Sequence, residues 1–533
     1  MFEIKAEHFL PDGSAEHSSS DLPPYPAVKV RDMDRVSGET PGRASWKKVG
    51  TKSGPKGRVF HLDDGDYFCY RSTAIGRGGF AKCYAGFDPE GKPICFKETN
   101  ILVGIEHGEK FNYKNPDGIR QSCYNEAAFL QVSKSLLTPS YILDRDNKIT
   151  TIMPLCRTEL SLWDSEWDGG PKPLFACAQD RVPGELPLLQ HDEKTVDMAS
   201  SIVHKVMLSV AETLRHVHAR GVLHRDLRCE NLLVSFDANE VFLADFNVSL
   251  DVRVRKPWTG GAEAGAPGLK APELTWDENY GLSTPLGTWQ KADIYPLAYS
   301  VSGLFAFAPE LTLCLDQTEM PAEEHRALSM GLRLYHERLG KGLPVAPART
   351  SAERGSVRFW HDAKQMRAPL PQLLAAMFSI NPDERPTASE IVTQLRNHPI
   401  PETDEAKCWW ERFRWPDATL DSLDGAHKLR EELLQRGVIS SGRQQRPLPD
   451  GKHRLNIPAP MTAAEARRVP QEEFDKQVDK EIREEMIHDV VYAIRKKLGP
   501  AAMGAAIVGL IMKAGEVFFC SSQESPQRGS HPA

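Results

Sequence analysis

The chain has 533 residues, of which 40% are hydrophobic and 26% charged, a composition that indicates a globular protein and excludes collagen-like and wholly disordered classes. Its 66 Lys and Arg against 73 Asp and Glu give a net charge of −7, so no basic surplus points to nucleic acid. The 10 cysteines include no C-x-x-C pair, which favours free thiols in a reducing compartment. The charged first ten residues do not resemble a signal peptide, and the apolar run 500–512 is too short to span a bilayer. We therefore expect a cytoplasmic or nuclear protein.

The first 60 residues are polar and rich in Ser and Pro, so we expect residues 1–60 to form a flexible extension. From Tyr67 to Lys97, β-rich runs separated by Gly and Asp-Pro turns predict an antiparallel meander. Within it lies a glycine-rich loop that could offer backbone N–H groups to phosphate oxygens, although an ordinary hairpin is the alternative. Its candidate binding residues are Ile75, Gly76, Gly78, Gly79 and Phe80.

Lys97 follows on the next predicted strand, where its cation could reach nucleotide phosphates. Such a lysine needs a carboxylate from a following helix to orient it. Glu126 in the sequence NEAAFLQ is our candidate, and Glu98 is the nearest rival.

Apolar residues between Ile202 and His218 recur at helical spacing and predict a helix with one buried face. The motif HRDLRCEN follows at 224–231, and Asp245-Phe246-Asn247 comes after it. In these motifs and their order, residues 66–398 resemble the eukaryotic protein kinase family, whose signature is HRDxxxxN followed by DFG and APE.

The resemblance implies an α+β bilobal fold over residues 61–400, with a small β-rich N-lobe at about 66–153 and a larger helical C-lobe at about 157–398. It also implies ATP and Mg²⁺ as cofactors and a protein as substrate. In this family Asp226 would orient the acceptor hydroxyl, and Asn231 and Asp245 would hold Mg²⁺. Arg228 stands where serine/threonine kinases usually place lysine, and would neutralise the γ-phosphate.

The same resemblance implies a nucleotide pocket. Cys83 and Cys95 would lie above the adenine and Leu233 below it, while Met153, Leu155 and Cys156 would belong to the hinge, with Met153 as gatekeeper. Plain core packing is the alternative for each of these residues. With Cys229, three of the pocket residues would form a cluster of four cysteines around the nucleotide.

Three further matches concern residues that are structural in the family rather than catalytic. Ala271-Pro272-Glu273 corresponds to APE, Arg385 to the arginine that pairs with its glutamate, and Asp293 to the aspartate that braces the catalytic loop. These matches favour protein kinases over small-molecule kinases.

The sequence departs from the family pattern at four positions. Ala81 replaces the third glycine of the loop, whose fragment GGFAKCY resembles Polo-like kinases, and Asn247 replaces the DFG glycine. Asparagine tolerates a left-handed backbone better than most residues. Ala266 and Leu269 replace the usual threonine and tyrosine of the activation segment, which leaves the acceptor class open.

The activation segment also carries the hydroxyl that we consider most suited to regulation. As a hypothesis, Thr259 is the phosphorylated residue that pairs with Arg225, and Glu263 is a permanent substitute for it.

Beyond the kinase-like region we expect a Trp-rich segment and linker at 401–460 and an amphipathic helical extension at 461–533. Apolar residues recur every four positions from Phe474 to Leu498, so this stripe must bury against something. Docking on the C-lobe is the first interpretation. A partner helix or self-association through 470–498 is the second, and membrane contact is the least favoured.

The sequence thus predicts an ATP-dependent protein kinase, with serine or threonine favoured over tyrosine as the acceptor. A tyrosine or dual-specificity kinase remains an alternative. A pseudokinase scaffold that signals through its C-terminal helix is another.

Overall fold

A computed structural model describes residues 30–32, 45–50, 54–77, 81–106, 109–112, 116–133, 137–145, 147–160, 172–175, 188–251, 269–276, 286–305, 322–440 and 442. The chain divides into two compact units, Met1–Leu455 and Asn456–Ala533, and all described residues belong to the first. The expected extension at 461–533, with its stripe at 470–498, lies outside the described residues.

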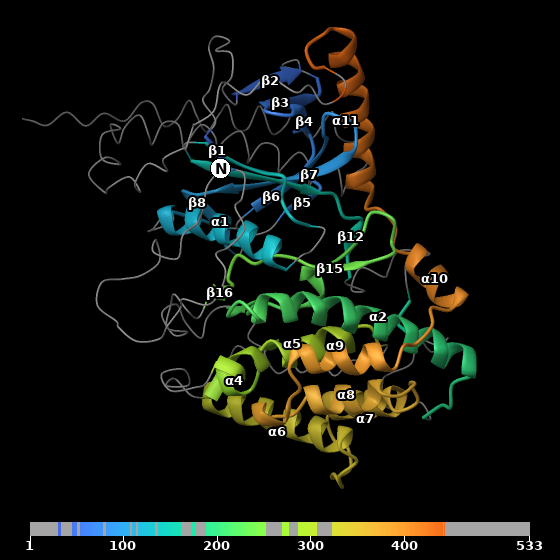
Figure 1. The fold of residues 1–533 in the computed structure, drawn as a ribbon. Coiled ribbons are helices and arrows are strands. Elements are labelled where there is room, and N and C mark those ends of the chain that lie inside the picture. Colours follow the sequence, from blue (N-terminus) through green and yellow to red (C-terminus); the bar gives the residue numbers. More distant parts are fainter. Residues whose placement is uncertain are drawn as a thin grey trace, which may run out of the picture. The chain divides into compact units, whose positions relative to one another are not determined.

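The N-terminal lobe is built on a sheet in which nine strands are described, ordered β1-β10-β11-β7-β6-β4-β3-β2, with β5 paired to β6 (Figure 1). All of its pairings are antiparallel except that of β1 with β10. The strands of this sheet are β1 (Val30–Asp32), β2 (Ser45–Gly50), β3 (Lys56–Leu62), β4 (Gly65–Tyr70), β5 (Gly76–Arg77), β6 (Ala81–Phe87), β7 (Pro93–Asn100), β10 (Tyr141–Arg145) and β11 (Lys148–Pro154). The antiparallel meander predicted from Tyr67 to Lys97 is confirmed.

Shorter strands form three small sheets within the described residues. In the first, β8 (Val103–Glu106) pairs with β9 (Glu109–Asn112), and in the second, β14 (Leu232–Val234) lies between β12 (Thr158–Glu159) and β15 (Val241–Leu243). The fourth pair joins β13 (Val222–Leu223) to β16 (Leu250–Asp251). Segment 224–231 runs from β13 to β14, and segment 244–249 runs from β15 to β16. These two small sheets therefore set the positions of both predicted catalytic motifs.

The C-terminal lobe is helical and is organised around α2, which packs against α5, α9, α10 and β15 (Figure 1). The predicted helix at 202–218 is confirmed within α2, which begins earlier, at Glu193, where the Asp192 side chain caps it. The helices of the described chain are α1 (Pro116–Val132), α2 (Glu193–His218), α3 (Glu273–Trp276), α4 (Leu286–Lys291), α5 (Ile294–Ser302), α6 (Ala322–Gly340), α7 (Ser351–Ala363), α8 (Leu370–Met377), α9 (Ala388–Asn397), α10 (Asp404–Glu411) and α11 (Asp417–Gln435). The antiparallel sheet followed by helices fits the expected bilobal architecture.

The flexible extension expected over residues 1–60 is too long. Strands β2 and β3 pair with each other, and β3 pairs with β4, so the sheet begins well before residue 61. Val59 and Phe60 are buried there, at 0% and 1% exposure. The polar average of this region concealed a short alternating stretch that gains its burial from pairing with β4.

Of the Trp-rich segment and linker expected at 401–460, residues 401–440 are largely helical and packed, and residues 443–460 lie outside the described residues. Trp409, Trp410 and Phe413 of the α10 region belong to the core of the C-terminal lobe. Helix α11 packs against β4 and β6 of the N-terminal lobe (Figure 1). Leu429 and Leu433 of this helix join Val59 and Phe68 in one apolar cluster. Residues after the kinase-like region therefore contact both lobes.

Among the helices within the described ranges, none combines the length and the apolar character needed to cross a lipid bilayer.

Candidate functional site

Lys97, Glu126 and Asp245 come from three different elements and meet in one chain of contacts. Lys97 on β7 donates to Glu126 Oε1 of α1 at 2.6 Å and to Asp245 Oδ1 at 3.1 Å. The rival carboxylate, Glu98, points to the opposite side of β7 because side chains alternate along a strand. It pairs with Arg58 at 2.7 Å and with Arg71 at 2.9 Å.

Burial and charge act against each other in this group. Burial alone would lower the pKa of Lys97, but the carboxylates of Glu126 and Asp245 raise it well above its usual value, so the lysine stays cationic. Burial raises the pKa of Glu126, partly opposed by Lys97. For Asp245, burial is outweighed by Lys97, which holds the pKa of that carboxyl below its usual value. The site thus keeps a cation beside a partly exposed anion, since the Asp245 side chain is 41% exposed.

The HRDLRCEN segment brings Asp226, Arg228 and Asn231 together. Asn231 Nδ2 donates to the backbone oxygen of Asp226 at 2.7 Å and to its carboxylate Oδ2 at 3.0 Å. Arg228 Nε lies 3.8 Å from the same Oδ2. Asn231 ends a short 3₁₀ turn, Cys229–Asn231, and Leu232 then starts β14. The turn thereby holds the amide against the aspartate.

A buried carboxylate supports this loop from the C-terminal lobe. Asp293 Oδ2 accepts from the backbone N–H of His224 at 2.8 Å and contacts His218 Nε2 at 2.9 Å. Its Oδ1 accepts from the backbone N–H of Arg225 at 2.9 Å. Burial is outweighed by His218 and these N–H donors, so the pKa of Asp293 is lowered and the group stays ionised. Arg225 itself has φ 71°, a left-handed value that these bonds help to hold.

His224 is fully buried between the two motifs. Its Nδ1 accepts from the backbone N–H of Asp226 at 3.3 Å, and its Nε2 lies 3.0 Å from the carbonyl oxygen of Ala244. A neutral ring with the proton on Nε2 satisfies both contacts. Burial lowers the pKa of His224, which agrees with a neutral ring. Its ring packs edge-on against Phe246, with centroids 4.6 Å apart.

The predicted adenine-contacting residues lie on neighbouring strands. In the register of β6, β7 and β11, Cys83 stands opposite Lys97, and Cys95 stands opposite both Ala85 and Met153. Leu155, which we predicted to belong to the hinge, is buried, while Met153 and Cys156 are partly buried against the C-terminal core. Leu233 on β14 is also partly buried against that core.

One of the four cysteines predicted around the nucleotide faces away from the strands that carry Cys83 and Cys95. Cys229 Sγ donates to the carbonyl oxygen of Ser300 on α5 at 3.1 Å, so this thiol faces the C-terminal lobe and the four-cysteine cluster is wrong in that member. Burial raises the pKa of Cys229 and of Cys156 to about 12. Cys83 differs: despite burial, hydrogen bonding with Cys95 lowers the pKa of its thiol, and Lys97 adds to the effect.

Only the ends of the glycine-rich loop are described. Gly76 belongs to β5 opposite Cys83, and Ile75 N–H donates to the Cys83 carbonyl at 2.9 Å. Gly78, Gly79 and Phe80 lie outside the described residues. Thr259, Glu263 and Ala266 do as well, so their roles stay predictions.

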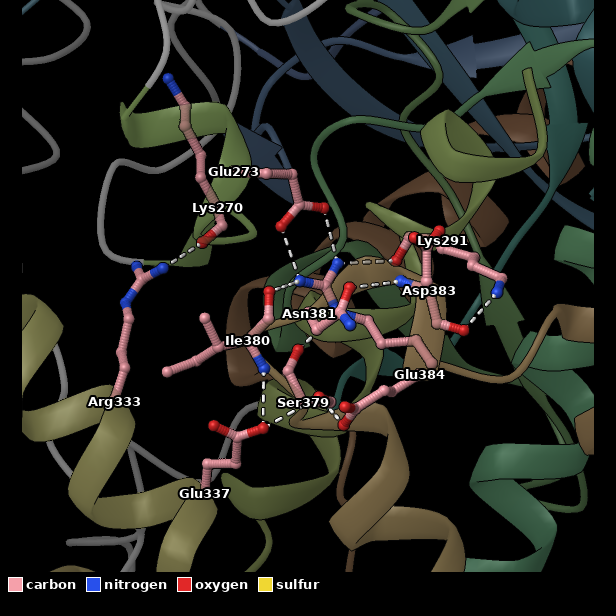
Figure 2. A network of polar contacts seen from close by, with 11 residues as sticks. Lys270, Glu273, Lys291, Arg333, Glu337, Ser379, Ile380, Asn381, Asp383 and Glu384 are labelled. Carbon is pink, nitrogen blue, oxygen red and sulfur yellow. Dashed lines mark hydrogen bonds and ion pairs between the residues drawn. The ribbon is translucent and has the colours of Figure 1, made fainter. Parts of the chain in front are cut away.

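Glu273 and Arg385 form the buried ion pair that the resemblance implied. Arg385 Nη1 and Nη2 donate to the two carboxylate oxygens of Glu273, each at 2.6 Å, and the side chains are 0% and 5% exposed. Figure 2 shows Glu273 at the end of a polar network that reaches Glu337 and Glu384 through Ser379. This bidentate pair ties α3 to the start of α9.

Asn247 does not have the left-handed backbone for which asparagine was thought suited. Among the described non-glycine residues, φ is positive at Arg225, Ala238 and Asp245, and the value at Asp245 is 62°. Sequence reasoning also missed what the Asn247 side chain does, because a departure from a glycine signals only lost freedom. Its Nδ2 donates to Asp245 Oδ1 at 2.5 Å.

Comparison with known proteins agrees with this geometry. Residues 174–398 match the family model described as the protein kinase domain. The match covers the HRDLRCEN segment, Asp245 and Arg385, whereas Lys97 and Glu126 precede it. These two residues are linked to the matched region by the contact of Lys97 with Asp245.

Three curated relatives are similar to this chain over short stretches. The chain is 38% identical over 82 residues to a calcium/calmodulin-dependent protein kinase type II of Caenorhabditis briggsae, which is 15% of either chain. It is 40% identical over 80 residues to the type II alpha chain of Drosophila melanogaster, covering 14% of this chain and 15% of that one. A third relative, serine/threonine-protein kinase ICK of Rattus norvegicus, is 32% identical over 112 residues, 21% of this chain and 17% of the relative.

The matches therefore span less than one fifth of the length of these relatives. Together with the family model they support a eukaryotic protein kinase. The Polo-like resemblance of the glycine-rich loop stays a prediction.

Proposed function

We propose that this chain is a protein kinase that transfers the γ-phosphoryl group of ATP to serine or threonine hydroxyls of a protein. The observation that carries the proposal is the contact of Lys97 with both Glu126 and Asp245, across β7, α1 and the segment after β15. An ion-pair network that served only stability would not require a carboxylate left 41% exposed beside a buried cation.

The donor set fits Mg²⁺. The metal prefers hard oxygen ligands, which the carboxylate of Asp245 and the amide oxygen of Asn231 can supply. Because Asn231 Nδ2 donates to Asp226, the amide is oriented with its oxygen as the remaining ligand atom. When bound, Mg²⁺ would neutralise the charge of the phosphates.

Each residue then has a positioning or electrostatic task. Lys97, oriented by Glu126, would hold the α- and β-phosphates, and the backbone around Gly76 would cover them. Asp226 would accept a hydrogen bond from the acceptor hydroxyl and align it with the γ-phosphate. Arg228, 3.8 Å from Asp226, would stabilise the charge that develops on the transferred group.

The nucleotide base would bind between the two lobes. Cys83, Cys95 and Met153 on adjacent strands and Leu233 on β14 offer apolar surface for the adenine, and the backbone at Leu155 and Cys156 offers polar atoms for its edge.

The experiment is phosphoryl transfer from labelled ATP with Mg²⁺ by the full chain, to itself and to generic protein substrates. Asp226→Asn and Asp245→Asn should each lower transfer by 100-fold or more, on the order of what a lost catalytic or metal-holding group costs. Asp237→Asn changes an exposed turn aspartate and serves as the matched control. ATP binding without transfer by the wild type would favour the scaffold alternative.

The acceptor class needs its own measurement. Serine/threonine specificity is supported by the named relatives, one of which is a serine/threonine-protein kinase. Phosphoamino-acid analysis of the labelled products distinguishes this from a tyrosine or dual-specificity kinase, because phosphotyrosine would then be recovered.

A further inference from the structure

Asp245 receives two hydrogen bonds on the same oxygen. Lys97 Nζ donates to Oδ1 at 3.1 Å, and Asn247 Nδ2 donates to Oδ1 at 2.5 Å. Both donors that contact this carboxylate within the described chain thus use Oδ1. This leaves Oδ2 as the oxygen available to an incoming cation.

The Asp245 carboxylate lies on an unusual backbone conformation and is partly exposed, so neighbouring donors are needed to fix its orientation. Asp245 has φ 62°, in the left-handed region that non-glycine residues seldom adopt, and its side chain is 41% exposed. An exposed carboxylate at such a position would sample several rotamers unless its neighbours restrict it. Asn247, two residues on, supplies a donor that the usual glycine of the family pattern lacks.

Asn247 is itself held by α1. Ser122 Oγ donates to the backbone oxygen of Asn247 at 2.5 Å, and the Glu126 carboxylate accepts from the backbone N–H of Phe246. The Phe129 ring lies 6.4 Å from the Phe246 ring, centroid to centroid. Ser122, Glu126 and Phe129 are spaced to share one face of the helix. One face of α1 therefore contacts residues 246 and 247, next to the metal-binding candidate.

We propose that Asn247 is a positioning residue, which orients the Asp245 carboxylate for Mg²⁺ and, through Ser122, couples that orientation to the position of α1. The inference rests on the proposed function only in that Asp245 binds the cation that accompanies the nucleotide. A hydrogen bond to an ionised group is among the stronger ones in proteins, and one that pre-orders a ligand lowers the cost of binding.

The test is the Mg²⁺ dependence of nucleotide binding, measured with a fluorescent non-hydrolysable ATP analogue and the full chain. Asn247→Ala removes the donor, and we expect half-saturation to need about tenfold more Mg²⁺. Binding of the analogue without Mg²⁺ should stay unchanged, since the adenine and Lys97 contacts remain.

Asn239→Ala is the matched control. Asn239 is exposed in the turn between β14 and β15, and its Nδ2 donates to Asp237 Oδ2 at 2.9 Å. This asparagine, like Asn247, contacts the aspartate two residues before it, but it lies outside the candidate site. Its Mg²⁺ dependence should equal that of the wild type. An unchanged Mg²⁺ dependence in Asn247→Ala, or an equal loss of metal-free binding, overturns the proposal.

The phosphoryl-transfer assay separates this inference from the proposed function. A wild type that transfers phosphate while Asn247→Ala keeps its Mg²⁺ dependence leaves the kinase standing and removes the inference. If Asn247→Ala raises the Mg²⁺ requirement for nucleotide binding but the wild type transfers no phosphate, the inference about Asn247 stands and the proposed kinase activity is removed.

Discussion

Arg157 donates from Nη1 to the backbone oxygen of Phe413 at 3.1 Å, joining the residue after the hinge to the segment between α10 and α11. Its other nitrogens reach the carbonyl oxygen of Phe236 at 3.0 and 3.2 Å, and the Trp415 ring packs on Phe236 with centroids 4.9 Å apart. These contacts hold the segment between α10 and α11 against residues 157 and 236, and α11 then packs on the N-terminal sheet. The packing of α11 should therefore be measurable in the stability of the whole domain.

The first prediction concerns Gly425, inside α11. A Cβ at this position would lie 2.5 Å from the Tyr70 hydroxyl oxygen and 2.6 Å from its Cζ, so Gly425→Ala should push α11 from β4. We expect a loss of about 1–3 kcal/mol in the free energy of unfolding, typical of overpacking. Urea denaturation followed by tryptophan fluorescence measures it.

Gly331 is the matched control, since it also lies inside a helix, α6, but no atom of the described residues comes within 4 Å of its added Cβ. Gly331→Ala should stabilise the protein by up to about 1 kcal/mol, the difference in helix propensity. Equal effects of the two substitutions would show that α11 does not pack closely on β4 in solution.

The second prediction concerns the buried pair of Arg385 and Glu273. Arg385→Met leaves the Glu273 carboxylate buried without its partner, which should cost about 3–5 kcal/mol. Adding Glu273→Leu to this variant should recover most of the loss, because the unpaired charge is then gone. Lys428→Ala, which breaks the exposed pair with Asp424, should leave the denaturation midpoint unchanged.

The third prediction is a pH dependence due to His336. This ring is 1% exposed among Phe359, Trp360 and Phe378, and burial lowers its pKa to about 3. A folded pKa below the unfolded value of 6.5 means that its contribution is complete above pH 6.5 and is lost as the pH falls toward 3. Between pH 7 and pH 5 the loss should be about 2 kcal/mol.

His336→Phe keeps an aromatic ring and removes the titrating group. The difference in unfolding free energy between wild type and variant, measured at both pH values, isolates the histidine from other titrating residues. A difference that does not change with pH would contradict the buried neutral imidazole.

The fourth prediction concerns Asp293 as a support of the catalytic loop. Asp293→Asn keeps the shape of the side chain but replaces one carboxylate oxygen with an NH₂ group. Either the contacts of Oδ2 with His218 and the His224 N–H or the contact of Oδ1 with the Arg225 N–H then lose their acceptor. We expect kcat to fall about tenfold or more, with the KM for ATP nearly unchanged, because the loop and not the nucleotide contacts is displaced. A raised KM at unchanged kcat would instead place Asp293 in nucleotide binding.

Sequence alone determined the parts of this protein that are local. The β-rich runs between turns predicted the meander from Tyr67 to Lys97, and helical periodicity predicted the helix after Ile202. Short motif spacing identified HRDLRCEN and Asp245-Phe246-Asn247 as the two candidate catalytic segments. None of these predictions needs knowledge of distant partners. The pair of Glu273 and Arg385, 112 positions apart, was implied only by the family resemblance.

Only the tertiary structure decided which distant groups meet. It paired Lys97 with Glu126 rather than Glu98, turned Cys229 toward Ser300, set Asn247 against Asp245, and packed the segment expected as a linker on both lobes. Such contacts depend on how strands and helices far apart in the chain pack. The partner of an apolar stripe or of a single amide side chain cannot be predicted from local sequence. The length and composition that first bounded the molecule were compatible with every one of these choices.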